Sequence, residues 1–236
     1  MKPCLTCNTK PIKNGIYKAN IQNFVLEKLP QNNKSFHNKI NQKFKLSGLE
    51  PNKTIFYFGT DENDFTKKIK DQLNAYNKLK NSGVVKVDKN GDATLYLNCP
   101  QLYMDLDGNV YGRHLHFIYY NDKKMKWDLD LFTHKVLCNV NKDFVEKHIK
   151  KVVIIDSRST EEYEKDHLKN AISFPYNKKI SEEIVMEKIQ SVKKNYSHKL
   201  CPIIIYCNSY DNGFKLYEKL NKLGFHNTVH YTWDSK

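Results

Sequence analysis

The sequence has no long apolar run. Among its 236 residues, no stretch approaches the roughly 18 consecutive apolar side chains that a membrane-spanning helix needs. Residues 1–8, MKPCLTCN, also lack the apolar segment of a secretory signal peptide. We therefore expect an intracellular, cytoplasmic protein without a membrane partner.

Arginine is scarce as well. Two of the 39 basic residues are arginines, so there is no arginine-rich tract, and no RNA-binding aromatic motif accompanies the lysines. The lysines are spread along the chain beside many asparagines and isoleucines, a pattern that an AT-rich coding sequence also produces. The net charge of +13 and the isoelectric point near 9.3 favour anionic partners. One hypothesis is therefore that the basic N-terminal part binds an acidic protein or a nucleic acid.

The sequence has no second Cys-x-x-Cys pair to accompany Cys4 and Cys7. Its six cysteines, in an intracellular protein, are expected to be thiols, metal ligands or redox groups rather than a disulfide framework. Two thiolates at the Cys4–Cys7 spacing can share one zinc ion, but a tetrahedral site needs two further ligands. The residues that could complete it are His37, Cys99, His114, His116 and Cys138. The pair is thus either a structural zinc site or two exposed thiols, and no other cofactor is expected.

Residues 1–143 are predicted to form an α+β domain. A short amphipathic helix over residues 21–29 ends before a proline. A strand at residues 54–59 is followed by a helix over residues 61–80, for which Asp61 is a suitable N-cap.

From residue 84 the pattern becomes all β. Asn90-Gly91 and Asp107-Gly108 are strong hairpin signals, because these dipeptides readily adopt the turns that join antiparallel strands. The predicted strands are residues 84–88, 93–99, 102–106, 110–120 and 125–132. Together they predict an antiparallel meander of about five strands over residues 84–140.

His114 and His116 lie two residues apart on one of these strands. Their side chains therefore share one face of the strand, about 6–7 Å apart. Such a pair can hold a metal ion or a phosphate, or it can simply belong to a polar face of the sheet.

After residue 143 strands alternate with helices. The predicted strands are residues 152–156, 171–175, 201–207 and 228–232, and the helices follow Thr160, Ser181 and Gly213. This alternation is typical of a parallel α/β sheet. We therefore predict two domains, residues 1–143 and residues 144–236.

Cys207 ends the strand at residues 201–207. Pro202 can only begin that strand, and helical periodicity starts at Gly213 and stops at Gly224. Open α/β sheets bind ligands at the carboxyl ends of their strands. A helix N-terminus there stabilises a thiolate and can lower a cysteine pKa to roughly 3.5–7.5. The alternative is that Cys207 is a small buried hydrophobic residue.

The order of short motifs in the C-terminal part resembles the rhodanese-like superfamily, which contains sulfurtransferases and the Cdc25 phosphatases. The matching segments are Val153-Ile-Ile-Asp156-Ser-Arg158, Glu161-Glu-Tyr163, Asp166-His-Leu-Lys-Asn-Ala171-Ile172, Pro202-Ile-Ile-Ile-Tyr-Cys207, Leu216–Leu220 and Leu223-Gly-Phe225. Residues 1–143 resemble no family that we recognise.

The resemblance implies a specific chemistry. It implies that Cys207 accepts a sulfane sulfur from a small donor, holds it as a persulfide and passes it to a nucleophile such as a protein thiol. It implies that Asp156 and Arg158 support the architecture of the site. It also implies a cradle of main-chain N–H groups in the loop Asn208, Ser209, Tyr210, Asp211, Asn212 and Gly213.

The loop departs from the family pattern at its charges. Sulfurtransferases of this family commonly carry arginine where this chain has Asn208 and Asn212, and Asp211 adds a negative charge. We therefore expect poor use of thiosulfate and a preference for other donors, because each lost charge-assisted hydrogen bond is worth about 1.5–3 kcal/mol. Gly213 stands where the phosphatases have their phosphate-binding arginine, which argues against phosphatase activity. The alternative is a catalytically degenerate rhodanese fold that acts as a binding or redox-sensing module.

Overall fold

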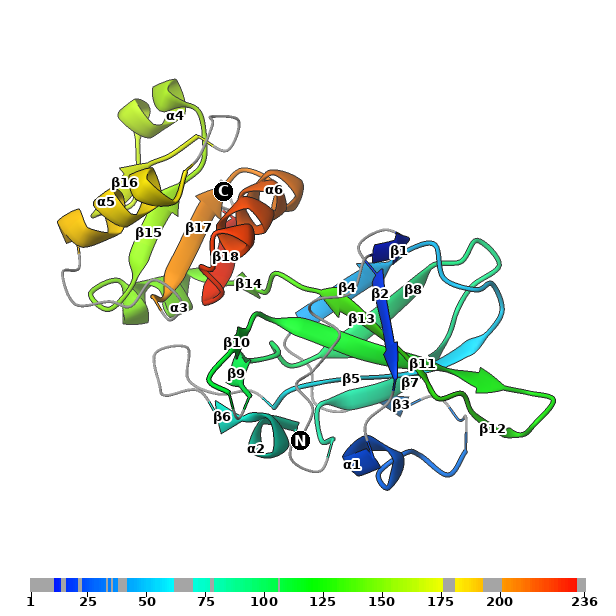
Figure 1. Cartoon of the computed structure of the whole chain (residues 1–236). Coiled ribbons are helices and arrows are strands. Elements are labelled where there is room, and N and C mark those ends of the chain that lie inside the picture. Colours follow the sequence, from blue (N-terminus) through cyan, green and yellow to red (C-terminus); the bar gives the residue numbers. More distant parts are fainter. Residues whose placement is uncertain are drawn as a thin grey trace. The chain divides into compact units, whose positions relative to one another are not determined.

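The structure is a computed structural model that describes residues 11–13, 16–20, 23–32, 34, 36–37, 42–61, 70–76, 79–105, 107–175, 181–192 and 201–232. The chain divides into two compact units, Met1–Val136 and Leu137–Lys236, whose elements are labelled in Figure 1. None of the helices within the described ranges is both long enough and apolar enough to cross a membrane. Cys4 and Cys7 lie outside the described residues, and the domain boundary near residue 143 remains a prediction.

The first unit is built on an antiparallel sheet, as the sequence predicts. The strand order is β1-β2-β13-β11-β5-β7-β3, and β12 pairs with β11. These strands are β1 (Pro11–Lys13), β2 (Ile16–Asn20), β3 (Phe36–His37), β5 (Thr54–Gly59), β7 (Ser82–Lys86), β11 (His114–Asn121), β12 (Lys126–Trp127) and β13 (Asp130–Lys135). The long strand β11 lies between β5 and β13, so residues far apart in sequence form the centre of the sheet.

Two smaller sheets complete this unit. Strands β4 (Gln42–Leu46) and β8 (Ala93–Leu97) form an antiparallel pair. Strands β10 (Val110–Tyr111), β9 (Tyr103–Met104) and β6 (Lys70–Asp71) form a three-stranded sheet. The helices α1 (Asn23–Leu26) and α2 (Gln72–Tyr76) are short.

The predicted continuous meander is wrong, because its strands belong to three different sheets and the predicted strand 110–120 is divided between β10 and β11. The hairpin at Asp107-Gly108 is present, because β9 pairs with β10. In contrast, the turn at Asn90-Gly91 joins strands of two different sheets, since β8 pairs with β4 and not with β7. The buried side chains of Phe44 and Leu95 face each other across β4 and β8. This apolar pairing between distant segments overrides the local hairpin signal.

The long helix predicted over residues 61–80 is also wrong where the structure describes it. Strand β6 occupies Lys70–Asp71, and a new short helix follows, with the Asp71 carboxylate accepting the Asn74 N–H at 3.1 Å. The main-chain N–H of Asp61 bonds to the carbonyl of Ala75 at 2.8 Å, and the residues that Asp61 would cap lie outside the described ranges. The rest of the predicted helix lies outside the described residues.

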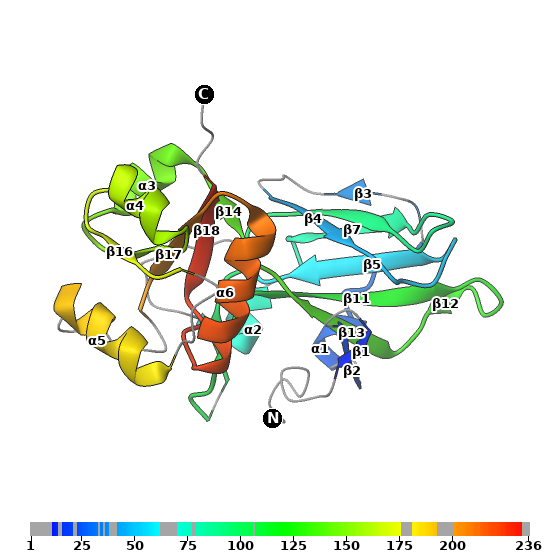
Figure 2. The same cartoon turned by 90° about the horizontal axis from the view of Figure 1, so that it is seen from above.

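The second unit is a parallel α/β sheet, which confirms the prediction. Its order is β14-β18-β17-β15-β16, and every pairing is parallel. The strands are β14 (Asn139–Val140), β15 (Val153–Asp156), β16 (Ala171–Ser173), β17 (Ile203–Cys207) and β18 (Thr228–Thr232), and the helices are α3 (Lys142–His148), α4 (Thr160–Lys165), α5 (Glu182–Val192) and α6 (Tyr210–Lys222). Figure 2 shows α3 and α4 on one face of this sheet and α5 and α6 on the other.

One local prediction in this unit needs correction, and one strand was not predicted. The polar segment that begins at Asn139 forms the edge strand β14, because it pairs with β18. Helix α4 is capped by Ser159 and not by Thr160, since the Ser159 hydroxyl and the Glu162 carboxylate form a reciprocal capping box.

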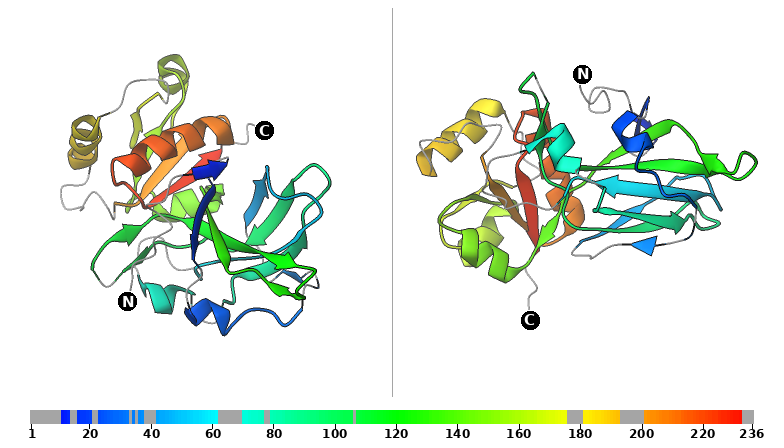
Figure 3. Two further views of the ribbon diagram at one scale, coloured as in Figure 1. Left: turned by 45° about the vertical axis from the view of Figure 1, so that its right-hand side comes forward. Right: turned by 90° about the horizontal axis from the view of Figure 1, so that it is seen from below.

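The core of the second unit lies between the sheet and helices α5 and α6. Ile203, Ile205 and Cys207 alternate along β17 and pack with Leu216 and Leu220 of α6. Figure 3 shows α6 lying along β17 and β18. The carboxyl end of β17 therefore lies next to the start of α6.

Candidate active site

Cys207 is the last residue of the central strand β17. It pairs in register with Thr232, and its side chain lies on the face covered by α6 because it alternates with Tyr206. The sequence predicts this position at the carboxyl edge of the sheet. However, the residue is only 1% exposed and belongs to the apolar cluster beneath α6. The sulfur is therefore enclosed and does not lie open at the edge.

The loop after Cys207 is shorter than the periodicity suggests. Only Asn208 and Ser209 separate the strand from α6, which begins at Tyr210 and not at Gly213. The Ser209 hydroxyl caps the helix by accepting the Asn212 N–H at 3.4 Å. Among the six predicted cradle residues, Tyr210, Asp211, Asn212 and Gly213 thus form the first turn of α6.

The N-terminus of α6 has opposing electrostatic features. The first main-chain hydrogen bond of the helix joins the Gly213 N–H to the Ser209 carbonyl at 3.2 Å. The N–H groups of Tyr210 and Asp211 lie before this bond, in the part of a helix whose N–H groups have no partner within the helix. Such N–H groups, together with the positive end of the helix dipole, favour an anion. The exposed carboxylate of Asp211 lies in this same turn and offsets that field. A role of this turn as a sulfur cradle remains a prediction.

Asp156 and Arg158 form an ion pair on the opposite face of the sheet from Cys207. Asp156 is fully buried and pairs in register with Tyr206, which places its side chain on the face away from α6. Arg158 Nε and Nη2 donate to the Asp156 carboxylate at 3.0 and 2.7 Å, and these bonds raise the pKa of Arg158. The guanidinium also lies 4.4 Å from the ring centre of Tyr206 and donates to the carbonyl of Asp166. Arg158 therefore supports the sheet behind Cys207.

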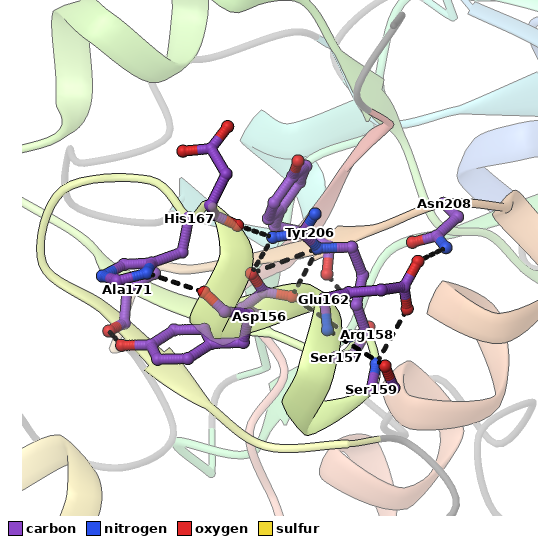
Figure 4. Close-up of polar contacts among 11 residues, drawn as sticks. Asp156, Ser157, Arg158, Ser159, Glu162, His167, Ala171, Tyr206 and Asn208 are labelled. Carbon is purple, nitrogen blue, oxygen red and sulfur yellow. Dashed lines mark hydrogen bonds and ion pairs between the residues drawn. The ribbon is translucent and has the colours of Figure 1, made fainter.

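Asn208, the residue after Cys207, is bound to helix α4. Its side-chain N–H donates to Glu162 Oε1, and Glu162 Oε2 accepts the Ser159 N–H at 3.0 Å (Figure 4). The Ser159 N–H is the largest cause, and the Asn208 amide a smaller one, of the lowered pKa of Glu162. Sulfurtransferases of the family that this domain resembles commonly have arginine at the position of Asn208. In this chain the position holds an amide, and its N–H already donates to the Glu162 carboxylate.

Side-chain contacts also hold the segment after α4, and Figure 4 labels His167 and Ala171 of this group. The Tyr163 hydroxyl donates to the carbonyl of Ala171 at 2.8 Å. The His167 ring stacks on the Tyr163 ring, with centroids 4.0 Å apart, and His167 Nδ1 lies 2.9 Å from the Tyr163 carbonyl oxygen. These contacts connect α4 to β16 and so fix the frame that positions Glu162.

His230 is a residue of the site that the sequence analysis missed. It is fully buried on β18, pairs in register with Ile205 and lies under the first turn of α6. A side chain at Gly213 would place its Cβ 2.4 Å from His230 Cδ2, so only glycine fits at this point of the helix. Burial lowers the pKa of His230 from about 6.5 to about 4, and the Ser209 main chain opposes this shift. Apart from this interaction with the Ser209 main chain, neither ring nitrogen has a well-aligned hydrogen bond to a described residue. Nothing in the strand pattern distinguishes His230 from an ordinary core position.

The other described cysteines differ in their surroundings, and the carbonyl of Cys138 accepts the His230 N–H at 2.8 Å. Cys201 is fully buried before the start of β17, and neither Cys201 nor Cys207 is in a disulfide. Cys99 and Cys138 are disulfide-bonded, so the expectation that they are thiols or zinc ligands is wrong. Within the described ranges, no group of three or more His, Cys, Asp or Glu side chains is arranged to hold a metal ion.

The comparisons with known proteins concern the second unit. Residues 141–233 match the sequence model of the rhodanese-like domain family. That part of the chain is therefore a rhodanese-like domain, and the match does not extend to residues 1–140. No curated protein matches the chain significantly.

Solved structures that resemble the chain cover about two fifths of it. An uncharacterized protein from Saccharomyces cerevisiae is 24% identical, with 40% of this chain and 84% of that chain covered and a TM-score of 0.31. A single-domain sulfurtransferase from Saccharomyces cerevisiae is 17% identical, with 43% and 87% covered and a TM-score of 0.34. A rhodanese-related protein from Thermoplasma volcanium is 18% identical, with 40% and 83% covered and a TM-score of 0.29.

Proposed function

We propose that the rhodanese-like domain is a sulfurtransferase in which Cys207 carries a sulfane sulfur as a persulfide. The observation that supports this most directly is the position of Cys207 at the end of the central strand, immediately before the N-terminal turn of α6. Ligands of open α/β sheets bind at this edge, and a helix N-terminus favours a negatively charged sulfur.

The proposed reaction needs no external oxidant or reductant. The Cys207 thiolate attacks the outer sulfur of a persulfide donor R–S–SH. The donor S–S bond breaks, R–S⁻ leaves, and Cys207–S–SH forms. A nucleophile such as a thiolate or cyanide then removes the outer sulfur and regenerates the Cys207 thiolate.

The side chains of the loop after Cys207 favour sulfur donors that carry little negative charge. Asn208 and Asn212 are neutral, Asp211 is negative, and the Asn208 amide is already bound to Glu162. A dianion such as thiosulfate lacks the cationic partners that are each worth about 1.5–3 kcal/mol. We therefore propose that small persulfides or polysulfides, or a protein persulfide, are better donors than thiosulfate.

One observation favours a second candidate function. Cys207 is 1% exposed within an apolar cluster, and this environment suits a small hydrophobic residue as well as a nucleophile. In this alternative, the domain is a catalytically degenerate rhodanese fold that serves as a binding or redox-sensing module.

Intact-mass spectrometry and cyanolysis of the full chain separate the two candidates. The protein is incubated with cysteine persulfide, inorganic polysulfide or thiosulfate, and desalted. We expect an added mass of about 32 Da on Cys207 and thiocyanate release on adding cyanide, with thiosulfate the weakest donor. The substitution Cys207→Ser should abolish both signals.

Cys201→Ser is the matched control. Cys201 is also a fully buried thiol outside any disulfide in the same unit, but it precedes the strand that Cys207 ends. We expect this variant to retain the adduct and the thiocyanate signal. If no donor gives a Cys207-dependent product, the sulfurtransferase proposal is wrong and the binding module is favoured.

A further inference from the structure

His114 and His116 form a buried pair in the first unit. Both lie on β11, are 3% and 2% exposed, and have ring centroids 4.8 Å apart. Their Nε2 atoms converge on a single phenolic oxygen. Tyr76 Oη on α2 lies 3.1 Å from His114 Nε2 and 2.8 Å from His116 Nε2. The Tyr103 hydroxyl on β9 lies 3.4 Å from His114 Nε2.

The opposite ring nitrogens fix the orientation of this pair. His114 Nδ1 lies 2.7 Å from the carbonyl oxygen of Gly112, which can only accept. His114 Nδ1 therefore carries a proton, and in the neutral tautomer Nε2 directs a lone pair towards Tyr76. His116 Nδ1 lies 2.7 Å from Thr133 Oγ1, its directly opposite neighbour on β13, and this hydroxyl can accept in the same way. Histidines that bind metals typically donate their other N–H to a carbonyl or a similar acceptor.

The distances from Tyr76 Oη to the two Nε2 atoms suit one metal ion. Zinc binds imidazole nitrogen at about 2.0–2.1 Å and oxygen at about 2.0–2.2 Å, so neighbouring ligands of a tetrahedral site lie about 3.3 Å apart. The separations from Tyr76 Oη of 3.1 and 2.8 Å are close to this value. A shift of a few tenths of an ångström would accommodate the ion. Imidazole ligands favour zinc, copper, iron and nickel over magnesium or calcium.

We propose that His114, His116 and Tyr76 hold one first-row transition-metal ion of the zinc class. The imidazoles bind through their Nε2 lone pairs. The ion replaces the phenolic proton of Tyr76, which passes to solvent, and no oxidation state changes. The third ligand is a tyrosine, so the His-x-His spacing in the sequence does not reveal it. This site is separate from the sulfur chemistry proposed for Cys207.

A titration of the full chain tests the site directly. The substitutions Cys4→Ser and Cys7→Ser remove the other predicted zinc site, and the protein is stripped with a chelator. Zn²⁺ binding is measured by calorimetry, and Co²⁺ binding by its visible ligand-field spectrum. We expect one ion of either metal per chain. The further substitution His116→Gln should abolish binding, and Tyr76→Phe should weaken it by at least about tenfold.

Tyr111→Phe is the matched control. Tyr111 belongs to the same aromatic cluster, but its hydroxyl donates to Asp105 at 3.0 Å, so we expect unchanged affinity. The protein with only Cys4→Ser and Cys7→Ser is the parent of these variants. Its own titration tests whether the site binds a metal ion, even if a further variant unfolds. If this parent binds neither ion, or if Tyr76→Phe binds as tightly as the parent, the cluster is only a hydrogen-bonded support for α2 and the proposal is overturned.

Discussion

Two sites of buried histidine, one in each unit, differ in their hydrogen bonds. In the first unit, each ring nitrogen of His114 and His116 lies within 3.1 Å of an oxygen atom. In the second unit, His230 is fully buried, and apart from its interaction with the Ser209 main chain neither ring nitrogen has a well-aligned hydrogen bond to a described residue. His114 and His116 thus belong to a hydrogen-bonded network inside an aromatic core. The ring nitrogens of His230 have no comparable network beneath α6, the helix that follows Cys207.

This difference has an energetic meaning. An unsatisfied buried polar group costs about 1–3 kcal/mol, whereas a satisfied one is close to neutral or modestly stabilising. The network around His116 therefore supports the fold of the first unit. His230 lacks such a network, and because it is buried its lowered pKa makes the stability of the second unit depend on pH. The predictions below test this contrast, beginning with the largest expected effect.

The largest effect should come from breaking the buried ion pair of the second unit. The side chains of Asp156 and Arg158 are 0% and 13% exposed. Arg158→Ala leaves the Asp156 carboxylate buried without its partner, so we expect a loss of about 3–5 kcal/mol in unfolding free energy. Urea denaturation measures it. Arg158→Lys keeps the positive charge but not the bidentate hydrogen bonding to Asp156, so we expect a smaller loss of unfolding free energy. Equal losses in the two variants would show that charge plays no part.

Acidification should destabilise the second unit through His230. Its pKa is about 4 when folded and about 6.5 when unfolded, so the unfolded state binds more protons between these values. Stability is therefore fully present above about pH 6.5 and is lost as the pH falls towards 4, by about 1–3 kcal/mol from this residue.

Urea denaturation between pH 7 and pH 4.5 measures this effect in the wild type and in His230→Leu. The variant should show the smaller pH dependence. An unchanged slope in the variant would mean that His230 is not a buried neutral imidazole. His134 in the first unit also has a pKa lowered to about 4 by burial, and His134→Leu provides the comparison between units.

Gly213→Ala tests the contact between α6 and His230. The added Cβ would lie 2.4 Å from His230 Cδ2, so the helix or the ring must move. We expect a destabilisation of about 1–3 kcal/mol, measured by denaturation. The double variant Gly213→Ala with His230→Ala should recover most of the loss caused by the added methyl group. Additive effects of the two substitutions would argue against a direct contact.

The smallest effect should follow from Glu162→Ala. This substitution removes half of the capping box of α4 and the bond to Asn208, and we expect a loss of about 1 kcal/mol. The exposed neighbour Glu161 is the matched control, because Glu161→Ala leaves the capping box intact. If the sulfurtransferase proposal holds, release of Asn208 should also change the rate of thiocyanate formation, which the cyanolysis assay measures.

Local patterns predicted the second unit better than the first. Runs such as Val153–Asp156 and Ile203–Cys207 alternate with amphipathic segments, and parallel α/β folds arise almost directly from this alternation. In the first unit, Asn90-Gly91 predicted a hairpin, yet β8 pairs with the distant β4. Antiparallel strands can pair across any distance in sequence, so local turn signals do not determine their neighbours.

The site shows the same division. The position of Cys207 at a strand end follows from Pro202, the apolar run and the later helical period, and all of these are local. The ion pair of Asp156 and Arg158 could be expected only from the family resemblance. Nothing local predicts that Asn208 binds Glu162 or that Tyr76 meets His114 and His116, since these contacts join segments that are 38 to 46 residues apart.

The sequence by itself determined the parallel sheet of the C-terminal part, the place of Cys207 at its edge and the lack of arginine after it. These properties depend on residue type and on short-range periodicity. Only the tertiary structure decided that Cys207 is enclosed, that His230 lies beneath Gly213 and that two histidines share one tyrosine oxygen. Burial and side-chain contact depend on which distant elements pack together, and no local pattern specifies that packing.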